Sequence, residues 1–110
     1  MSAPKGSRGL ERIFKEGKRF STVYFTARWH PQVELDKPII VVGQKTSKKA
    51  TVRNRIRRRF RSLLKDFPQK GLVILGRLPA EKAPFRVLKN EVVRLQRRVG
   101  ENGQRRHWSN

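Results

Sequence analysis

The stretch that decides the fold is residues 45–61, which read KTSKKATVRNRIRRRFR. It holds nine Lys or Arg residues in seventeen positions and no acid. Val52, Ile56 and Phe60 recur every four positions, which is the spacing of a buried stripe on an α-helix. We therefore predict a helix from about Thr51 to Lys65, with the basic side chains fanned over its exposed face.

Two apolar runs flank this predicted helix. IIVVG at residues 39–43 and GLVILG at residues 71–76 have the length and β-branched content of buried strands. Ser47 or Thr51 is the expected N-cap, and Phe67-Pro68 ends the helix. Strand, helix and strand in this order predict a parallel crossover, whose general expectation is a right-handed path. Because residues 39–43 are apolar on both faces, we expect that strand to be central in the sheet.

The two ends of the chain have weaker patterns. Residues 1–7 are rich in Pro, Gly and Ser and are expected to be disordered. A short amphipathic helix is predicted after them, ending at Gly17. The last predicted helix runs from Ala83 to Val99, and residues 100–110 are expected to form a flexible basic tail.

The aromatic and β-branched run FSTVYFTARW, residues 20–29, predicts a strand with two different faces. On alternation, one face looks like core and the other mixes aromatic with polar groups, a surface suited to single-stranded nucleic acid. The expected core face holds Val23, Phe25, Ala27 and Trp29, and the other face holds Phe20, Thr22, Tyr24, Thr26 and Arg28.

The net charge points to a polyanionic partner. There are 28 basic and 8 acidic residues, so the 110-residue chain carries a formal charge of +20. Such self-repulsion indicates nucleic acid first and an anionic membrane second. The membrane is the weaker reading, because no apolar run approaches the roughly 18 residues of a spanning helix. The N-terminus also lacks the apolar core of a signal peptide, so we expect a soluble, cytoplasmic protein.

The residue types on the predicted basic helix suit phosphate. Arg53, Arg57 and Arg61 form one stripe on the helical wheel, and Asn54 with Arg58 forms a neighbouring one. Guanidinium groups pair bidentately with phosphate oxygens and also stack on bases. The Asn54 amide can both donate and accept hydrogen bonds.

A protein active site is not expected. Phosphodiesterases need clustered carboxylates for metals or a histidine pair for acid and base work. The close acidic pair Glu34 and Asp36 lies in a predicted turn, and His30 and His107 are far apart in the chain. There is no cysteine, so disulfides and thiolate metal sites are excluded.

The segment Ala50 to Arg58, ATVRNRIRR, follows a strand and a Lys-rich turn and resembles the Arg-Asn-Arg signature of the protein subunit of bacterial ribonuclease P. Leu10, Phe14 and Gly17, followed by an aromatic strand at Phe25, are similar to that family's opening helix and first strand. The resemblance covers residues 8–99, which we take as a single RNA-binding domain.

This resemblance implies an α+β fold, a small α/β sandwich with a mixed sheet and an unusual left-handed βαβ crossover, as in a ribosomal-protein-type domain. It also implies that the catalyst is an RNA subunit, which uses Mg²⁺ held mainly by the RNA to remove the 5′ leader from precursor tRNA. The protein would be the assisting subunit of this endonuclease, with no catalytic residue and no metal site of its own.

The family's roles, carried onto this sequence, fall on two sets of residues. The contacts with the catalytic RNA fall on Lys45, Lys49, Arg53, Asn54, Arg55, Arg57, Arg58 and Arg61. The cleft for the single-stranded leader falls on Phe14, Tyr24 and Arg28. Leu10 and Arg28 stand where the family often has aromatic residues, and Lys48-Lys49 where it commonly has Gly and a small or polar residue. We therefore expect less base stacking and more phosphate contact than is usual in the family.

Other interpretations remain open at this stage. A ribosomal or general RNA-binding protein would have the same size and charge, and a DNA-packaging protein would bind duplexes without regard to the 2′-hydroxyl. Phe14 is equally suited to a core, and Tyr24 to an ordinary strand surface.

Overall fold

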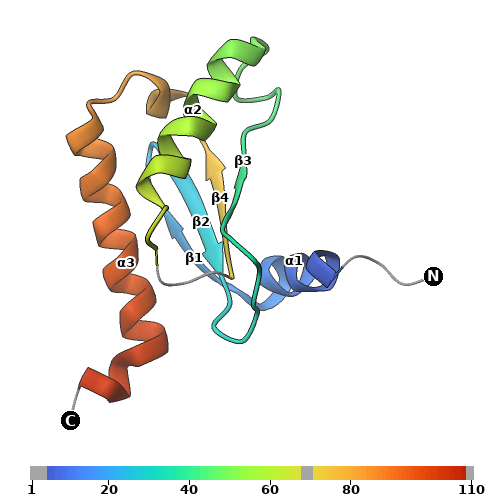
Figure 1. Cartoon of the computed structure of the whole chain (residues 1–110), viewed down its shortest axis with the longest axis vertical. Coiled ribbons are helices and arrows are strands. Elements are labelled where there is room, and N and C mark those ends of the chain that lie inside the picture. Colours follow the sequence, from blue (N-terminus) through green and yellow to red (C-terminus); the bar gives the residue numbers. More distant parts are fainter. Residues whose placement is uncertain (1–4, 68–70, 109–110) are drawn as a thin grey trace.

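The basic helix connects two parallel strands that are paired with each other, as the sequence predicts. The computed structural model describes residues 5–67 and 71–108, with side chains from residue 9 to 67 and from 71 to 100. Figure 1 shows how the helices are arranged around one sheet. In chain order the elements are α1 (Lys5–Glu16), β1 (Lys18–Ser21), β2 (Phe25–Trp29), β3 (Ile39–Val41), α2 (Ala50–Leu63), β4 (Leu72–Gly76), the short 3₁₀ helix η1 (Leu78–Glu81) and α3 (Phe85–Trp108).

The four strands form one mixed sheet in the order β1-β2-β4-β3. β1 pairs antiparallel with β2, β2 antiparallel with β4, and β3 parallel with β4. The prediction that residues 39–43 form a central strand is wrong, because β3 lies at the edge and β4 is inside the sheet. β3 is apolar on both faces because Ile40 packs against the core under α2 and Ile39 against a second cluster under α1.

The connection from β3 through α2 to β4 is left-handed. In Figure 1, α2 lies in front of the sheet, both strands point up, and β4 is to the left of β3. The right-handed path expected from strand order alone is therefore wrong, and the α/β sandwich implied by the family resemblance is confirmed. The reason is geometric: with α2 on this face, a right-handed path would put β4 beyond β3, where it could not pair with β2.

The two faces of the sheet carry cores of different size. The larger core lies under α2 and α3, where the Phe25 ring meets Phe60 of α2 edge to face at a centroid distance of 5.5 Å. Gly76 of β4 allows this close approach, because a Cβ there would lie 2.9 Å from Ile56 Cγ2. The smaller core lies under α1, and Ile13 and Val73 are fully buried in it. Consequently the face bearing α1 is less covered than the face bearing α2 and α3.

The predicted strand over residues 20–29 is wrong in its middle, because β1 and β2 form a hairpin instead. The Thr22 hydroxyl accepts hydrogen bonds from the amides of Tyr24 at 3.0 Å and Phe25 at 3.2 Å, which turns the chain. Val23 is 64% exposed in this turn, whereas Phe20, expected on the other face, pairs with Ala27 and joins the larger core. Period-two alternation is lost where a turn intervenes.

Helix extends further toward both ends of the chain than expected. α1 begins at Lys5, inside the segment predicted to be disordered, and α3 reaches Trp108, inside the predicted tail. Residues 1–4 and 109–110 lie outside the described residues. In the part of the chain that the structure describes, no helix has the length and apolar character needed to cross a membrane.

Candidate nucleic-acid interface

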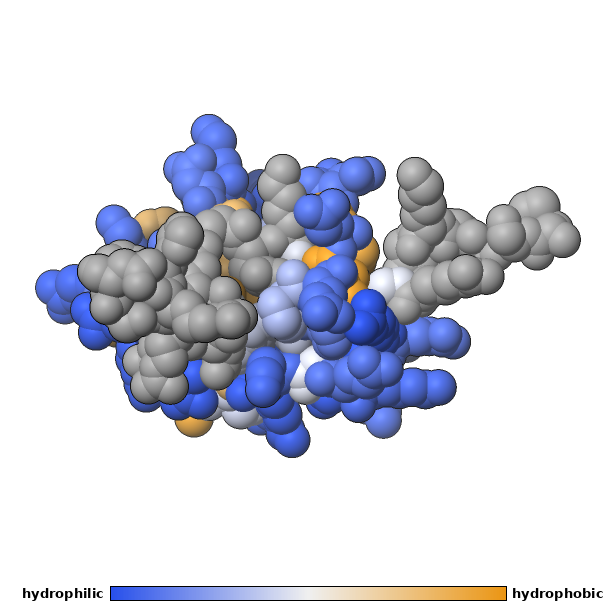
Figure 2. Space-filling model, turned by 90° about the horizontal axis from the view of Figure 1, so that it is seen from below, coloured by the Kyte–Doolittle hydropathy of each residue, from blue (hydrophilic) through white to orange (hydrophobic). Residues whose placement is uncertain are grey.

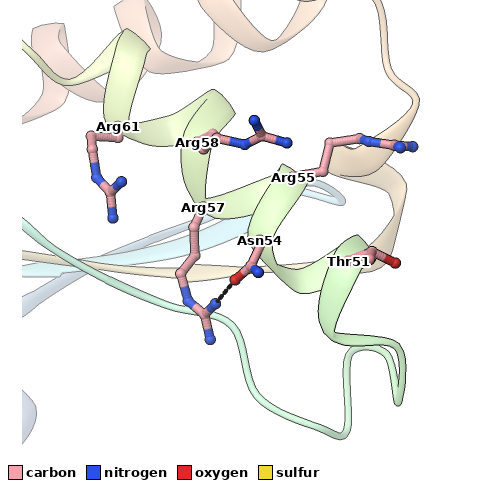
Figure 3. Close-up of a pocket in the computed structure, with 6 residues that line it drawn as sticks. All are labelled: Thr51, Asn54, Arg55, Arg57, Arg58 and Arg61. Atoms are coloured by element: carbon pink, nitrogen blue, oxygen red, sulfur yellow. Dashed lines mark hydrogen bonds between the residues drawn. The ribbon is translucent and has the colours of Figure 1, made fainter.

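α2 has a buried side and an exposed basic side. Ile56 and Phe60 are fully buried against the sheet, which orients the rest of the helix. Figure 3 shows the exposed side, where an open pocket of about 590 Å³ lies along the helix. Its lining residues are Thr51, Asn54, Arg55, Arg57, Arg58 and Arg61. Five of the eight residues predicted to contact RNA therefore share one surface.

Some guanidinium N–H groups of Arg53 and Arg57 already donate hydrogen bonds within the protein. Arg57 Nη1 donates to Asn54 Oδ1 at 2.6 Å, the bond drawn in Figure 3, and Nη2 donates to the Val42 carbonyl at 3.2 Å. Arg53 Nη1 donates to the Ser47 carbonyl at 2.8 Å. These bonds hold the segment between β3 and α2 against the helix, so both arginines have a structural role in addition to their charge.

Arg55 and Arg59 face η1. Arg55 Nη1 lies 2.8 Å from the Glu81 carboxylate, in an ion pair whose arginine side chain is 55% exposed. Arg59 Nη1 donates to the carbonyls of Ala80 and Glu81, both at 2.8 Å. The arginines on this side of α2 therefore attach η1 to the helix.

Arg58 and Arg61 differ from the other arginines of α2. Both are exposed, and neither has a hydrogen-bond or ion-pair partner among the side chains and backbone that the structure describes. Their guanidinium donors face solvent beside Asn54, which is also exposed. An unpaired guanidinium can meet an anion without breaking a bond within the protein, so these two are the most available donors on α2.

The turn before α2 adds exposed lysines. Lys45, Lys48 and Lys49 are all exposed, and Lys49 is the N-cap. The predicted caps Ser47 and Thr51 are therefore wrong; the Ser47 hydroxyl instead accepts from the Lys49 amide at 3.2 Å, which shapes the turn. No side chain caps α2 and no acid lies in its first turn, so its amide donors and the lysines attract the same anions.

Phe14 and Arg28 come together on the opposite face of the sheet. Arg28 Nη2 donates to the Phe14 carbonyl at 2.7 Å, and its guanidinium carbon lies 5.6 Å from the centre of the Phe14 ring. Arg28 Nε is buried without a hydrogen-bond partner in the described part of the chain, and Phe14 is 42% exposed. Tyr24 is not part of this group, because it lies in the hairpin turn and packs against the larger core.

Hydroxyl groups lie next to this pair, and the Thr26 side chain is buried. Thr26, on the same side of β2 as Arg28, shares a 2.8 Å hydrogen bond with Ser21, and Arg77 Nη2 donates to Thr26 Oγ1 at 3.0 Å. Strand alternation had placed Thr26 beside Arg28, but Arg77 is 51 residues from Thr26 and carried no sequence signal. The surface thus offers a half-exposed ring with two arginines, and the expected shift toward phosphate contact stays a prediction.

The family model for Ribonuclease P matches residues 5–100. The chain belongs to this family. Ribonuclease P protein components from two strains of Thermus thermophilus are each 36% identical to it over 98 residues, covering 87% of this chain and 58% of the relative. The chain therefore spans less than two thirds of the length of these relatives. A ribonuclease P protein component from Rickettsia bellii is 31% identical over 102 residues, covering 80% of this chain and 85% of that protein.

Solved structures of ribonuclease P proteins have the same fold. The protein from Thermotoga maritima superposes with a TM-score of 0.67 at 26% identity, over 89% of this chain and 97% of that one. The Staphylococcus aureus protein gives 0.63 at 21% identity, over 87% and 93% of the two chains. The α2 arginines and the Phe14–Arg28 pair both lie within the segment matched to the ribonuclease P family.

The acidic residues of this ribonuclease P family member are dispersed. Across the described residues, no three His, Cys, Asp or Glu side chains are grouped closely enough to hold a metal ion. Three of the acids are engaged with arginines: Glu16 with Arg12, Glu81 with Arg55 and Glu91 with Arg94. The exposed surface is largely hydrophilic in the view of Figure 2, with small hydrophobic areas between the polar side chains.

Proposed function

We propose that this chain is the protein subunit of a cytoplasmic ribonuclease P ribonucleoprotein, which removes the 5′ leader of precursor tRNA. The observation that carries the proposal is the exposed face of α2, where Arg58, Arg61 and Asn54 stand on a helix of this family without competing acids. On this proposal α2 docks on the catalytic RNA subunit, and Lys45 and Lys49 extend the contact at the start of the helix.

The leader of the precursor tRNA is proposed to lie on the other face of the sheet. Phe14 offers a ring for a base, and Arg28, held over that ring, offers donors to a neighbouring phosphate. Mature tRNA lacks the leader, so this surface would favour the precursor over the product. Tyr24 is not included, because its ring belongs to the larger core.

The chemistry is proposed to belong to the RNA subunit and to Mg²⁺ held mainly by that RNA. When bound, the metal ion stabilises developing negative charge on phosphodiester oxygens and favours ionisation of the attacking water. The residues of this chain would act by position and charge: they hold the leader, and a net charge of +20 reduces the repulsion between RNA strands. The protein should therefore matter most when Mg²⁺ is scarce.

The test is cleavage of precursor tRNA at low Mg²⁺ by the protein alone, by a bacterial ribonuclease P RNA alone and by the two together. Cleavage at the mature 5′ end only in the mixture would support the proposal. Failure to assist several such RNAs would instead favour a ribosomal or general RNA-binding protein. Cleavage by the protein alone would place catalytic groups in this chain and refute the assignment to RNA.

A further inference from the structure

A second group of arginines lies beside β1, at the other edge of the sheet from β3, on the face that α2 and α3 cover. Arg94 and Arg98 of α3 both approach the ring of Phe20 on β1, each with its guanidinium carbon 5.6 Å from the ring centre. They are four residues apart, so they are neighbours on one side of the helix. Lys18, two residues before Phe20 on β1, is also exposed and shares the strand face of Phe20.

This arrangement keeps two like charges close together, and only Arg94 is paired with an acid among the side chains that the structure describes. Arg94 Nη1 donates to Glu91 at 2.8 Å, with the Arg94 side chain 63% exposed, whereas Arg98 has no ion-pair partner in the part of the chain whose side chains are described. Two like charges at this spacing on a helix repel each other and destabilise it slightly. The Phe20 ring offsets some of that cost by cation–π attraction to both groups.

The ring also prepares the arginines for a ligand. A guanidinium held against an aromatic ring loses side-chain freedom before binding, while its other N–H donors remain available. Phe20 itself is only 8% exposed, so its ring supports the arginines and is not free to stack on a base. The group thus resembles a phosphate contact more than a base-stacking platform.

We propose that Lys18, Arg94 and Arg98 form a third RNA-binding surface, in addition to α2 and the Phe14–Arg28 face, which contacts phosphates of an RNA segment other than the one bound by α2. The inference goes beyond the proposed function, because it adds a contact at the β1 edge of the sheet. α2 instead connects β3 and β4, which lie at the other end of the strand order. The protein would then bridge two RNA segments. These phosphates belong either to the catalytic RNA or to precursor tRNA.

The test compares the double variant R94Q/R98Q with wild type. Glutamine keeps much of the side-chain stem and can still lie on the Phe20 ring, but it removes both charges. Binding to a bacterial ribonuclease P RNA transcript is measured from 50 to 200 mM salt, and binding of precursor tRNA is measured with the assembled complex. R86Q is the matched control, because Arg86 is exposed on the same helix, two turns before Arg94.

If both arginines contact phosphates, the slope of log K against log salt falls by about two in one of these titrations. The affinity advantage at 50 mM over 200 mM salt then shrinks by roughly tenfold. The RNA that shows the change identifies the source of the phosphates, and R86Q should change neither slope. Unchanged slopes for R94Q/R98Q with both RNAs would overturn the inference, as would an equal change for R86Q.

The cleavage assay with the wild-type protein separates this inference from the proposed function. If the proposed function fails, the wild-type protein does not assist cleavage, yet the slope change of R94Q/R98Q on either RNA still reports phosphate contact. A fall in melting temperature without any slope change would mean that Arg94 and Arg98 only cover Phe20, and that result also overturns the inference.

Discussion

Arg58 and Arg59 are adjacent on α2 but should respond to alanine substitution in opposite ways. Arg58 is exposed and has no protein partner among the described residues, whereas Arg59 donates to the carbonyls of Ala80 and Glu81 at 2.8 Å each. Alanine removes one positive charge in both cases and favours the helix equally. The two variants are therefore matched in charge and in helix propensity and differ in what the side chain touches.

The expected magnitudes follow from these contacts. Arg59→Ala removes two charge-assisted bonds to partly buried carbonyls, which we expect to cost about 1–3 kcal/mol of unfolding free energy after water partly replaces them. For a domain of this size, that corresponds to a fall of roughly 5–15 °C in melting temperature. Arg58→Ala should change stability by less than about 0.5 kcal/mol, but should lower the salt slope of RNA binding by about one unit.

Thermal unfolding followed by circular dichroism measures the first quantity, and filter binding across a salt series measures the second. The reasoning is refuted if Arg58→Ala destabilises the fold as much as Arg59→Ala does. It is also refuted if Arg59→Ala, assayed well below its melting temperature, changes the salt slope more than Arg58→Ala. Either result would mean that the hydrogen bonds to η1 do not decide which arginines are available to RNA.

Three further substitutions test other parts of the molecule. Phe14→Ala should weaken binding of precursor tRNA by roughly 1–3 kcal/mol while leaving mature tRNA unchanged; an equal loss for both RNAs in a competition assay would exclude leader stacking at this ring. Tyr24→Ala should lower the unfolding free energy by about 2 kcal/mol, because the ring packs on the larger core, and a leader-specific loss at unchanged stability would restore the cleft role predicted from sequence. Gly76→Ala should cost about 1–3 kcal/mol, since the new Cβ would lie 2.9 Å from Ile56 Cγ2 and 3.1 Å from Val42 Cγ2; a variant as stable as wild type in chemical denaturation would show that α2 can shift away.

The sequence predicted α2 well because the signal for an amphipathic helix is local. Ile56 and Phe60 are the two fully buried residues of α2, as their spacing indicated, and the basic residues between them cover the exposed side. The same local pattern, together with the opening helix, was sufficient to indicate the family. Where a turn formed by one hydroxyl interrupted a strand, at Thr22, the alternation rule placed Val23 and Phe20 on the wrong faces.

The sequence by itself therefore determined most of the helices and strands, the family and the large positive charge, because helical and strand periodicity and charge are properties of neighbouring residues. Only the tertiary structure decided that β4 pairs with both β2 and β3. It also decided that Arg55 and Arg59 are bonded, while Arg58 has no partner among the described residues. Those outcomes depend on which carbonyls and carboxylates the fold brings within about 3 Å of each guanidinium. Such partners lie tens of residues away in the chain, where no local pattern records them.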